Sequence, residues 1–205
     1  MQIDLDSLPP LEAYHVLTQT IIPRPVAWVL SQNPAGDYNL APFSFFTPIT
    51  SNPPLLMLSI GKKPTDGAPK DTRVNIEQRQ WFVVHIAHRE LAVPMTETAR
   101  TLPLGESELA RVDLELVPFD GFPLPRLKDC RVALACELYD IQEIGAVPQS
   151  LVFGRIRQVF VADPAVTEDD KGRVRFDAAC LDPLSRLGGS EYATFGGVIK
   201  VPRPA

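Results

Sequence analysis

The chain is organised around residues 39–73, which read NLAPFSFFTPITSNPPLLMLSIGKKPTDGAPKDTR. The first part, residues 39–54, is punctuated by prolines and mixes aromatic rings with hydroxyl and amide side chains. It is too polar for a core and too aromatic for an ordinary linker, so it suits a flat, amphipathic ligand. Residues 55–60 (LLMLSI) follow as a short apolar run, which predicts a strand buried on both faces because six residues are too few for a helix.

The same stretch ends in a cationic loop and a predicted helix start. Lys62, Lys63 and Lys70 lie within nine residues of the chain. Thr72 is expected to cap a helix over residues 73–80, whose first turn would offer free backbone N–H groups and the positive end of the helix dipole. With Lys70 beside it, this helix start is a physically sensible phosphate site. Lys62 and Lys63 are expected to be solvated surface charges.

Length and composition limit the possible classes of protein. With 205 residues and 45% apolar composition, residues 1–205 are expected to form a single domain. The formal net charge of −5 gives no field that would attract nucleic acid or an anionic membrane surface. The N-terminal residues lack the pattern of a secretory leader, and no segment approaches the ~18 apolar residues of a membrane span. We therefore expect a cytoplasmic protein that binds neither nucleic acid nor membrane.

Several familiar chemistries have no motif here. The sequence contains neither of the Gly-rich phosphate loops G-x-G-x-x-G and G-x-x-x-x-G-K-[ST], and neither G-x-S-x-G nor H-E-x-x-H. The histidines have no metal-ligand spacing, and His85 is compatible either with a backbone partner inside a strand or with a ligand. The cysteines form no C-x-x-C and are expected to be buried apolar residues; they are Cys130, Cys136 and Cys180. No metal site and no catalytic side chain are predicted.

The order of the predicted elements indicates a mainly β fold. Short helices are expected over residues 7–19, 73–80 and 88–100, the last broken by Pro94, and strands over 21–32, 38–42, 55–60, 81–87, 114–118, 131–144, 150–162 and 173–177. Residues 131–144 and 150–162 form a predicted hairpin, across which Glu137 is expected to meet Arg155 or Arg157. Because strands and helices do not alternate regularly, the pattern favours an antiparallel barrel with helical additions.

Several short motifs occur in a fixed order and carry a family resemblance. They are PRPVAW at 23–28, Gly36, NLAPFSFF at 39–46, SNPP at 51–54, KDT at 70–72 with Asn75, and RLGG at 186–189 with Tyr192. In this combination the sequence resembles the flavin reductase-like family of FMN-binding split-barrel proteins, over most of the chain. The resemblance implies a mainly β fold with short α-helices, a six-stranded antiparallel split barrel, and a homodimer with FMN near the interface.

The resemblance also implies which residues bind the cofactor. The isoalloxazine ring of FMN would lie along Ser44, Phe45, Phe46 and Thr47, and the phosphate near Ser59, Lys70, Asp71 and Thr72. Arg24 and Trp28 would lie close to the cofactor. Arg186 and Tyr192 match the late motif of the family and are included as cofactor-binding candidates, although contact with the partner subunit or with their own core is equally compatible with the sequence. Phe45 and Phe46 are likewise compatible with core packing.

The function implied is that of an FMN flavoprotein, with two alternatives. In the first, the chain is an NAD(P)H-dependent flavin reductase in which NADH or NADPH delivers a hydride to the flavin, and free flavin, a partner oxygenase or another acceptor takes the electrons. The protein then positions and tunes the cofactor and needs no acid–base residue. In the second, the chain is a flavoredoxin-like electron carrier that exchanges electrons with a protein partner. A non-redox binding module is a more distant reading.

Overall fold

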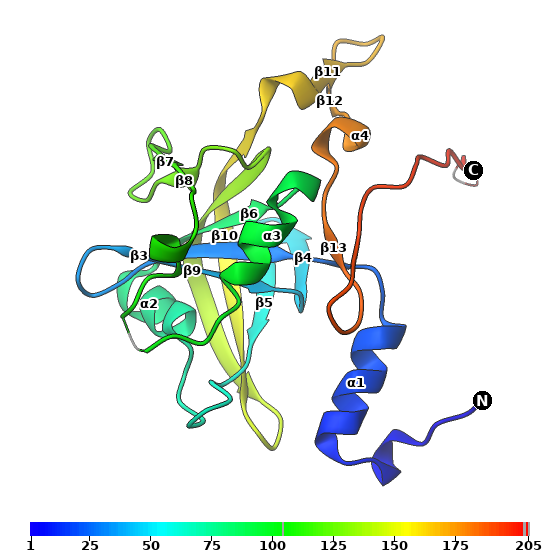
Figure 1. Ribbon diagram of the computed structural model, residues 1–205. Helices are drawn as coiled ribbons and strands as arrows, with labels where there is room; N and C mark the ends of the chain where they lie inside the picture. The colour runs from blue at the N-terminus through cyan, green and yellow to red at the C-terminus, as the bar shows by residue number, and fades with distance from the viewer. Residues whose placement is uncertain (104, 203, 205) are drawn as a thin grey trace.

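The computed structural model describes residues 1–103, 105–202 and 204, and it is built around one antiparallel sheet (Figure 1). This main sheet has the strand order β3-β2-β6-β9-β10-β5-β4. Its strands are β2 (Ala27–Gln32), β3 (Tyr38–Phe43), β4 (Phe46–Ser51), β5 (Pro54–Ile60), β6 (Trp81–Ile86), β9 (Val132–Ile144) and β10 (Gln149–Val161). The mainly β, split-barrel class is therefore confirmed. The main sheet has seven strands rather than six because β4 adds to its edge through pairing with β5.

Short elements surround this sheet. The smaller strand groups are β1 (Arg24–Pro25) with β13 (Ser185–Arg186) and β14 (Tyr192–Ala193), β7 (Leu116–Val117) with β8 (Arg126–Leu127), and β11 (Val166–Glu168) with β12 (Val174–Phe176). The helices are α1 (Pro10–Thr20), α2 (Asp71–Arg79), α3 (Ala92–Glu97) and α4 (Ala178–Leu181), with 3-10 turns η1 (Leu5–Ser7), η2 (Arg89–Leu91), η3 (Glu108–Arg111) and η4 (Asp163–Ala165). In Figure 1, α1 lies beside the barrel near the segment that carries β13. Within the described residues, no helix combines the length and apolar character that a membrane crossing requires.

The predicted strands and turns are confirmed in their main features. The turn expected between residues 32 and 38 is present, with Gly36 at a positive φ of 96° that favours glycine. The helix expected over residues 88–100 is divided into η2 and α3, and Pro94 stands in the first turn of α3, where its missing N–H is not needed. Glu137 lies opposite Arg155 in the β9–β10 register but pairs with Arg157, whose Nη1 is 3.3 Å from the Glu137 carboxylate.

The expectation that Thr72 caps α2 is wrong. The helix begins at Asp71, and its N-cap is Lys70, which has extended backbone angles and makes no side-chain capping bond. Thr72 lies one residue further into the first turn, where it is buried. Its Oγ1 instead accepts a hydrogen bond of 2.9 Å from Nδ2 of Asn39 on β3. The hydroxyl therefore holds the helix against the sheet rather than closing the helix end.

Strands β2 and β6 bury side chains on both faces of the main sheet, whereas β10 buries one face and exposes Arg155, Arg157 and Val159 on the other. One set of buried residues, which we call the inner cluster, includes Ala27, Val29, Leu56, Leu58, Ile76, Phe82 and Val152. The other set, the outer cluster, includes Val26, Trp28, Leu30, Met95, Leu124 and Leu127 and lies under α3 and the segment that carries β8. Strand β2 supplies residues of alternating parity to both clusters. The prediction that β5 is buried on both faces is confirmed for one face, which carries Leu56, Leu58 and Ile60; on the other face Leu55 is buried, but Met57 and Ser59 are only half-buried.

The buried cysteines and His85 have structural roles. Cys130 and Cys136 are buried as expected, and burial raises the pKa of both thiols, while Cys180 is only half-buried. His85 is fully buried, with Nδ1 3.1 Å from the carbonyl oxygen of Trp28, and its Nε2 accepts a 2.9 Å hydrogen bond from the Leu127 N–H. Burial lowers the pKa of His85 to about 4, so the ring is neutral at pH 7. The backbone-partner alternative for His85 is therefore confirmed.

The Phe82 ring of β6 extends to the backbone of β10, and a glycine at position 154 leaves the space for it. A Cβ atom added at Gly154 would overlap the Phe82 ring and lie 3.3 Å from Cδ1 of Leu56. Gly154→Ala should therefore lower the free energy of unfolding by about 1–3 kcal/mol, because a packed interior cannot accept the extra carbon without strain. Thermal melts should show a loss of about 2–4 °C for each kcal/mol.

The matched control is Gly196→Ala, since no atom lies within 4 Å of an added Cβ at that position. It should leave the melting temperature unchanged. Adding Phe82→Leu to Gly154→Ala should cost less than the sum of the two single changes, because Phe82→Leu removes the ring that the added methyl group would overlap. An unchanged melting temperature in Gly154→Ala would contradict the packing argument.

Candidate functional site

Three adjacent cavities meet at the C-terminal end of β3 and the residue that follows it. We name them after the elements that line them: the α1 cavity of about 620 Å³, the α2 cavity of about 120 Å³ and the β14 cavity of about 290 Å³. All three are lined by Pro42. The α1 and α2 cavities also share Phe43 and Lys70, and the α1 and β14 cavities share Ser44. The shared residues show that the three cavities lie next to one another.

The α1 cavity has aromatic and hydroxyl walls. Tyr14 and Leu17 line it from α1, while Ser44 and Phe45 line it from the connection between β3 and β4. The Tyr14 and Phe45 ring centroids are 6.3 Å apart. Ser59 lines the floor on β5, and its backbone N–H donates a 2.8 Å hydrogen bond to the Phe45 carbonyl, which fixes the aromatic segment over the strand. This combination fits a flat ring with polar edges.

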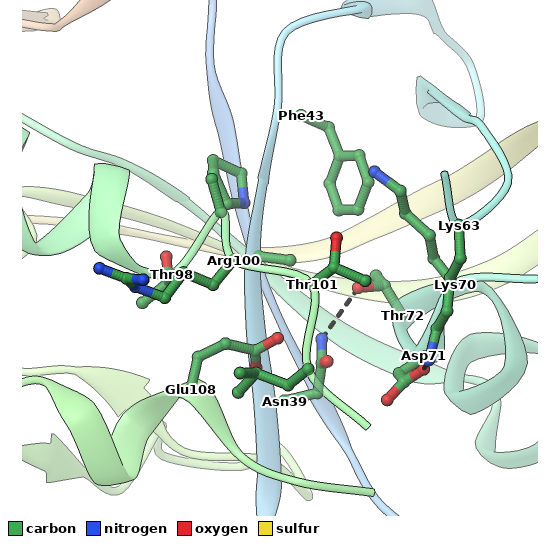
Figure 2. Close-up of a pocket in the computed structure, with 14 residues that line it drawn as sticks. Asn39, Phe43, Lys63, Lys70, Asp71, Thr72, Thr98, Arg100, Thr101 and Glu108 are labelled. Atoms are coloured by element: carbon green, nitrogen blue, oxygen red, sulfur yellow. Dashed lines mark hydrogen bonds and ion pairs between the residues drawn. The ribbon is translucent and has the colours of Figure 1, made fainter. Parts of the chain in front are cut away.

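The α2 cavity is lined by charged and hydroxyl groups at the start of α2 (Figure 2). The Lys70 ammonium lies 5.4 Å from the centroid of the Phe43 ring, and burial lowers the pKa of this lysine. Lys63 Nζ is 2.5 Å from Oδ1 of Asp71, and the other oxygen of Asp71 accepts a 3.2 Å hydrogen bond from the Gly105 N–H. The side chain of Lys63 is only 11% exposed, so the expectation that Lys63 is a solvated surface charge is wrong. Lys62 is half-buried.

Glu108 is a member of this cavity that sequence reasoning missed. It lies at the start of η3, is 6% exposed, and accepts a 3.1 Å hydrogen bond through Oε2 from the Leu40 N–H. Burial raises the pKa of Glu108 to about 7, the negative charge of Asp71 adds to this rise, and the Leu40 N–H and the Lys63 charge oppose it. No sequence motif marks this glutamate; only the packing of η3 against β3 reveals it.

The β14 cavity contains the two late candidates. Arg186 and Tyr192 both line it, together with Ser44 and Thr96. The Arg186 guanidinium lies 4.7 Å from the centroid of the Tyr192 ring and also donates to the Gly189 carbonyl. Thr96 Oγ1 on α3 donates a 3.0 Å hydrogen bond to the Tyr192 hydroxyl. This cavity is therefore formed by segments more than 90 residues apart in the chain.

Two predicted residues support the walls of the site from behind. Trp28 has no exposed surface, and its Nε1 donates a 2.8 Å hydrogen bond to Oγ1 of Thr98, which lines the α2 cavity. Arg24 is buried and donates to the carbonyl oxygens of Thr18 (2.6 Å), Ile21 (2.7 Å) and Leu187 (2.9 Å). Its guanidinium is 6.0 Å from the Phe45 ring centroid, so Arg24 positions both the end of α1 and the aromatic wall.

Two further predicted residues lie outside the three cavities. Phe46 is half-buried and packs against the inner cluster, whereas Thr47 is exposed on the edge strand β4. The remaining candidates line at least one cavity. In the α1 cavity these are Ser44, Phe45, Ser59 and Lys70, in the α2 cavity Lys70, Asp71 and Thr72, and in the β14 cavity Ser44, Arg186 and Tyr192.

Comparisons with known proteins agree with this architecture. Residues 19–175 match the family model described as flavin reductase like domain. YwrF from Bacillus subtilis is 36% identical over 205 residues, which cover 98% of this chain and 97% of that protein. The nitrilotriacetate monooxygenase component B from Bacillus cereus has a TM-score of 0.88 at 33% identity, with 98% of each chain covered. The Pseudomonas fluorescens 2-nitrobenzoate 2-nitroreductase NbaA has a TM-score of 0.87 at 28% identity, covering 100% of this chain and 96% of that one. The chain therefore belongs to the flavin reductase-like domain family.

Proposed function

We propose that this chain binds FMN across the α1 and α2 cavities and is an NAD(P)H-dependent flavin reductase. The observation that carries the proposal is that these two cavities adjoin at Phe43 and Lys70, so that an aromatic wall lies next to a cationic helix start. Membership of the flavin reductase-like family and the similarity to a monooxygenase component B support an oxidoreductase.

The residues present fit the parts of FMN. The ring would lie in the α1 cavity against Phe45 and Tyr14, with the Ser44 and Ser59 hydroxyls near its polar edge. The phosphate would lie in the α2 cavity, held by Lys70 and by the first backbone N–H groups of α2, which have no acceptor within the helix. Asp71 and Thr72 would complete the wall beside the phosphate without supplying positive charge. The negative charge of Asp71 is paired with Lys63.

Bound FMN would supply the capacity to accept a hydride and pass electrons on. The role of this chain is to hold the ring, to exclude water from one of its sides and to leave access for a second substrate. The β14 cavity adjoins the ring site at Ser44 and has Arg186 on its wall, a cation suited to the negative charge of a nicotinamide dinucleotide. A partner oxygenase or free flavin is the acceptor that the component B relationship suggests, and a nitroaromatic compound is the acceptor suggested by the nitroreductase.

The decisive experiment is anaerobic reduction of the purified protein reconstituted with FMN. A yellow protein whose visible absorbance bleaches rapidly with NADH or NADPH, and returns on addition of free FMN or 2-nitrobenzoate, is the expected result. A yellow protein that stays oxidised with both nicotinamides but is reduced by a protein electron donor would favour the electron carrier instead. A protein that takes up no FMN would overturn both readings.

The placement of the phosphate gives a sharper prediction. A charge-assisted hydrogen bond contributes about 1.5–3 kcal/mol, so Lys70→Ala should raise the FMN dissociation constant roughly 10- to 100-fold. Riboflavin lacks the phosphate, so its affinity should hardly change. Fluorescence titration of both flavins checks this. Lys171→Ala, on the exposed turn between β11 and β12, is the matched control and should bind FMN like the unchanged protein. Equal weakening of both flavins would mean that Lys70 supports the ring pocket instead.

We further propose that the protein is a homodimer, as the family resemblance implies. Helix α1 buries only Thr18, and it exposes Leu11 (65%) and Tyr14 (50%), followed by Ile21 (61%). In the tail of the chain, Val198 is 67% exposed and could add to such an interface, whereas Phe195 is half-buried. An apolar helix face next to the ring cavity is suited to isologous pairing with a second copy.

Analytical ultracentrifugation at micromolar concentration should therefore give about twice the chain mass of 22.6 kDa. Leu11→Asp combined with Ile21→Asp should shift the protein to the monomer, because a carboxylate is costly to bury in an apolar interface. Val147→Asp is the matched control, since Val147 is 70% exposed at the β9–β10 turn. If the unchanged protein sediments as a monomer, the homodimer proposal is wrong.

A further inference from the structure

We propose that Glu108 is the proton acceptor linked to phosphate binding in the α2 cavity, so that the site takes up a proton when it binds a dianionic phosphate monoester. The inference rests on the proposed placement of the FMN phosphate. It assigns to Glu108 a positioning and regulatory role that no motif of the chain indicates. The chemistry concerns protonation only, and the proton comes from solvent.

The geometry places Glu108 inside the anion-binding cavity rather than on the surface. Its side chain reaches the cavity from η3, on the opposite side of Asn39 from Asp71 in Figure 2. The hydrogen bond from the Leu40 N–H fixes Oε2, and Ser107 secures the start of η3 by donating to the Tyr38 carbonyl. Glu108 thus cannot swing into solvent without breaking the contact between η3 and β3.

The charges around Glu108 determine what a phosphate does to it. Lys63 and Asp71 neutralise each other in their ion pair, and Arg100, at the outer rim, pairs with Glu97. Among the described residues, Lys70 forms no ion pair and contributes the remaining positive charge of the cavity. The charges that act on Glu108 directly are those of Asp71 and Lys63. A dianion held in this cavity of about 120 Å³ would share it with the buried Glu108 carboxylate, an arrangement that protonation of Glu108 relieves.

Glu108 is suited to respond in this way because its pKa is already about 7 without the ligand. At pH 6 the carboxyl is mostly neutral, and the phosphate meets no opposing charge. At pH 8 it is mostly ionised and must take up a proton on binding. Linkage then predicts that the contribution of Glu108 weakens FMN binding by up to about tenfold between pH 6 and pH 8. The carboxyl form can also donate a hydrogen bond to a phosphate oxygen, which the carboxylate cannot.

Isothermal titration calorimetry of FMN into the apoprotein at pH 8, in buffers of different ionisation enthalpy, measures the protons taken up. Free FMN phosphate is already dianionic at this pH, because its second pKa is about 6. The expected uptake approaches one proton per FMN and is absent for riboflavin. Glu108→Gln keeps the acceptor for the Leu40 N–H but carries no charge. It should abolish the uptake and bind FMN up to about tenfold more tightly than the unchanged protein at pH 8, with little difference at pH 6.

The remaining outcomes are distinguishable. FMN binding without proton uptake in the unchanged protein overturns the inference while leaving the proposed function intact, and this arm does not depend on the variant folding. Uptake that persists in Glu108→Gln assigns the proton to another group and also overturns the inference. Uptake with riboflavin equal to that with FMN would place the proton at the ring. Failure of the unchanged protein to bind FMN overturns the proposed function itself.

Discussion

The burial of β2 on both faces is the constraint on which the rest of the structure depends. Ala27 and Val29 enter the inner cluster, while Trp28 and Leu30 enter the outer cluster. A strand of this kind cannot lie at the surface, so the sheet must curl around one side while other segments cover the second. Helix α3 and the segment before β9 provide that cover. The close approach at Gly154 is the corresponding requirement on the inner side.

The site lies where the strands that are buried on both faces come to an end. Pro42 at the end of β3 is opposite Trp28 in the strand register, and it is the residue that all three cavities share. Beyond this point the chain leaves the packed sheet and presents Ser44 and Phe45 to the α1 cavity. The core therefore fixes the wall on which a ligand would lie, and α1, α2 and η3 supply the other side chains that line the cavities.

The sequence predicted the strands well because their apolar runs are bounded by proline and glycine, as at residues 55–60. It located Lys70, Ser44 and Tyr192 through motifs, but it misjudged Thr72 because a threonine at a helix start has the same preference whether it caps or packs. The sequence did not predict that Lys63 is largely buried or that Glu108 is present in the site. Lys63 is paired with Asp71, and the environment of Glu108 is created by η3 packing on β3, a contact between segments 68 residues apart that no local pattern records. Trp28 and Arg24 match the family motif, but they do not line the cavities; they contact the residues Thr98 and Phe45 that do.

The three carbonyl acceptors of Arg24 have a consequence for the ends of the chain. Two of them belong to the end of α1 and its following residue, and the third is Leu187, within the loop between β13 and β14. One guanidinium thus unites segments more than 160 residues apart, and β1 pairs with β13 beside it. The end of α1 and the loop between β13 and β14 are therefore held together on one side of the barrel. Removing either segment would leave donors of the buried Arg24 guanidinium without acceptors, so we expect the two segments to accept changes together rather than separately.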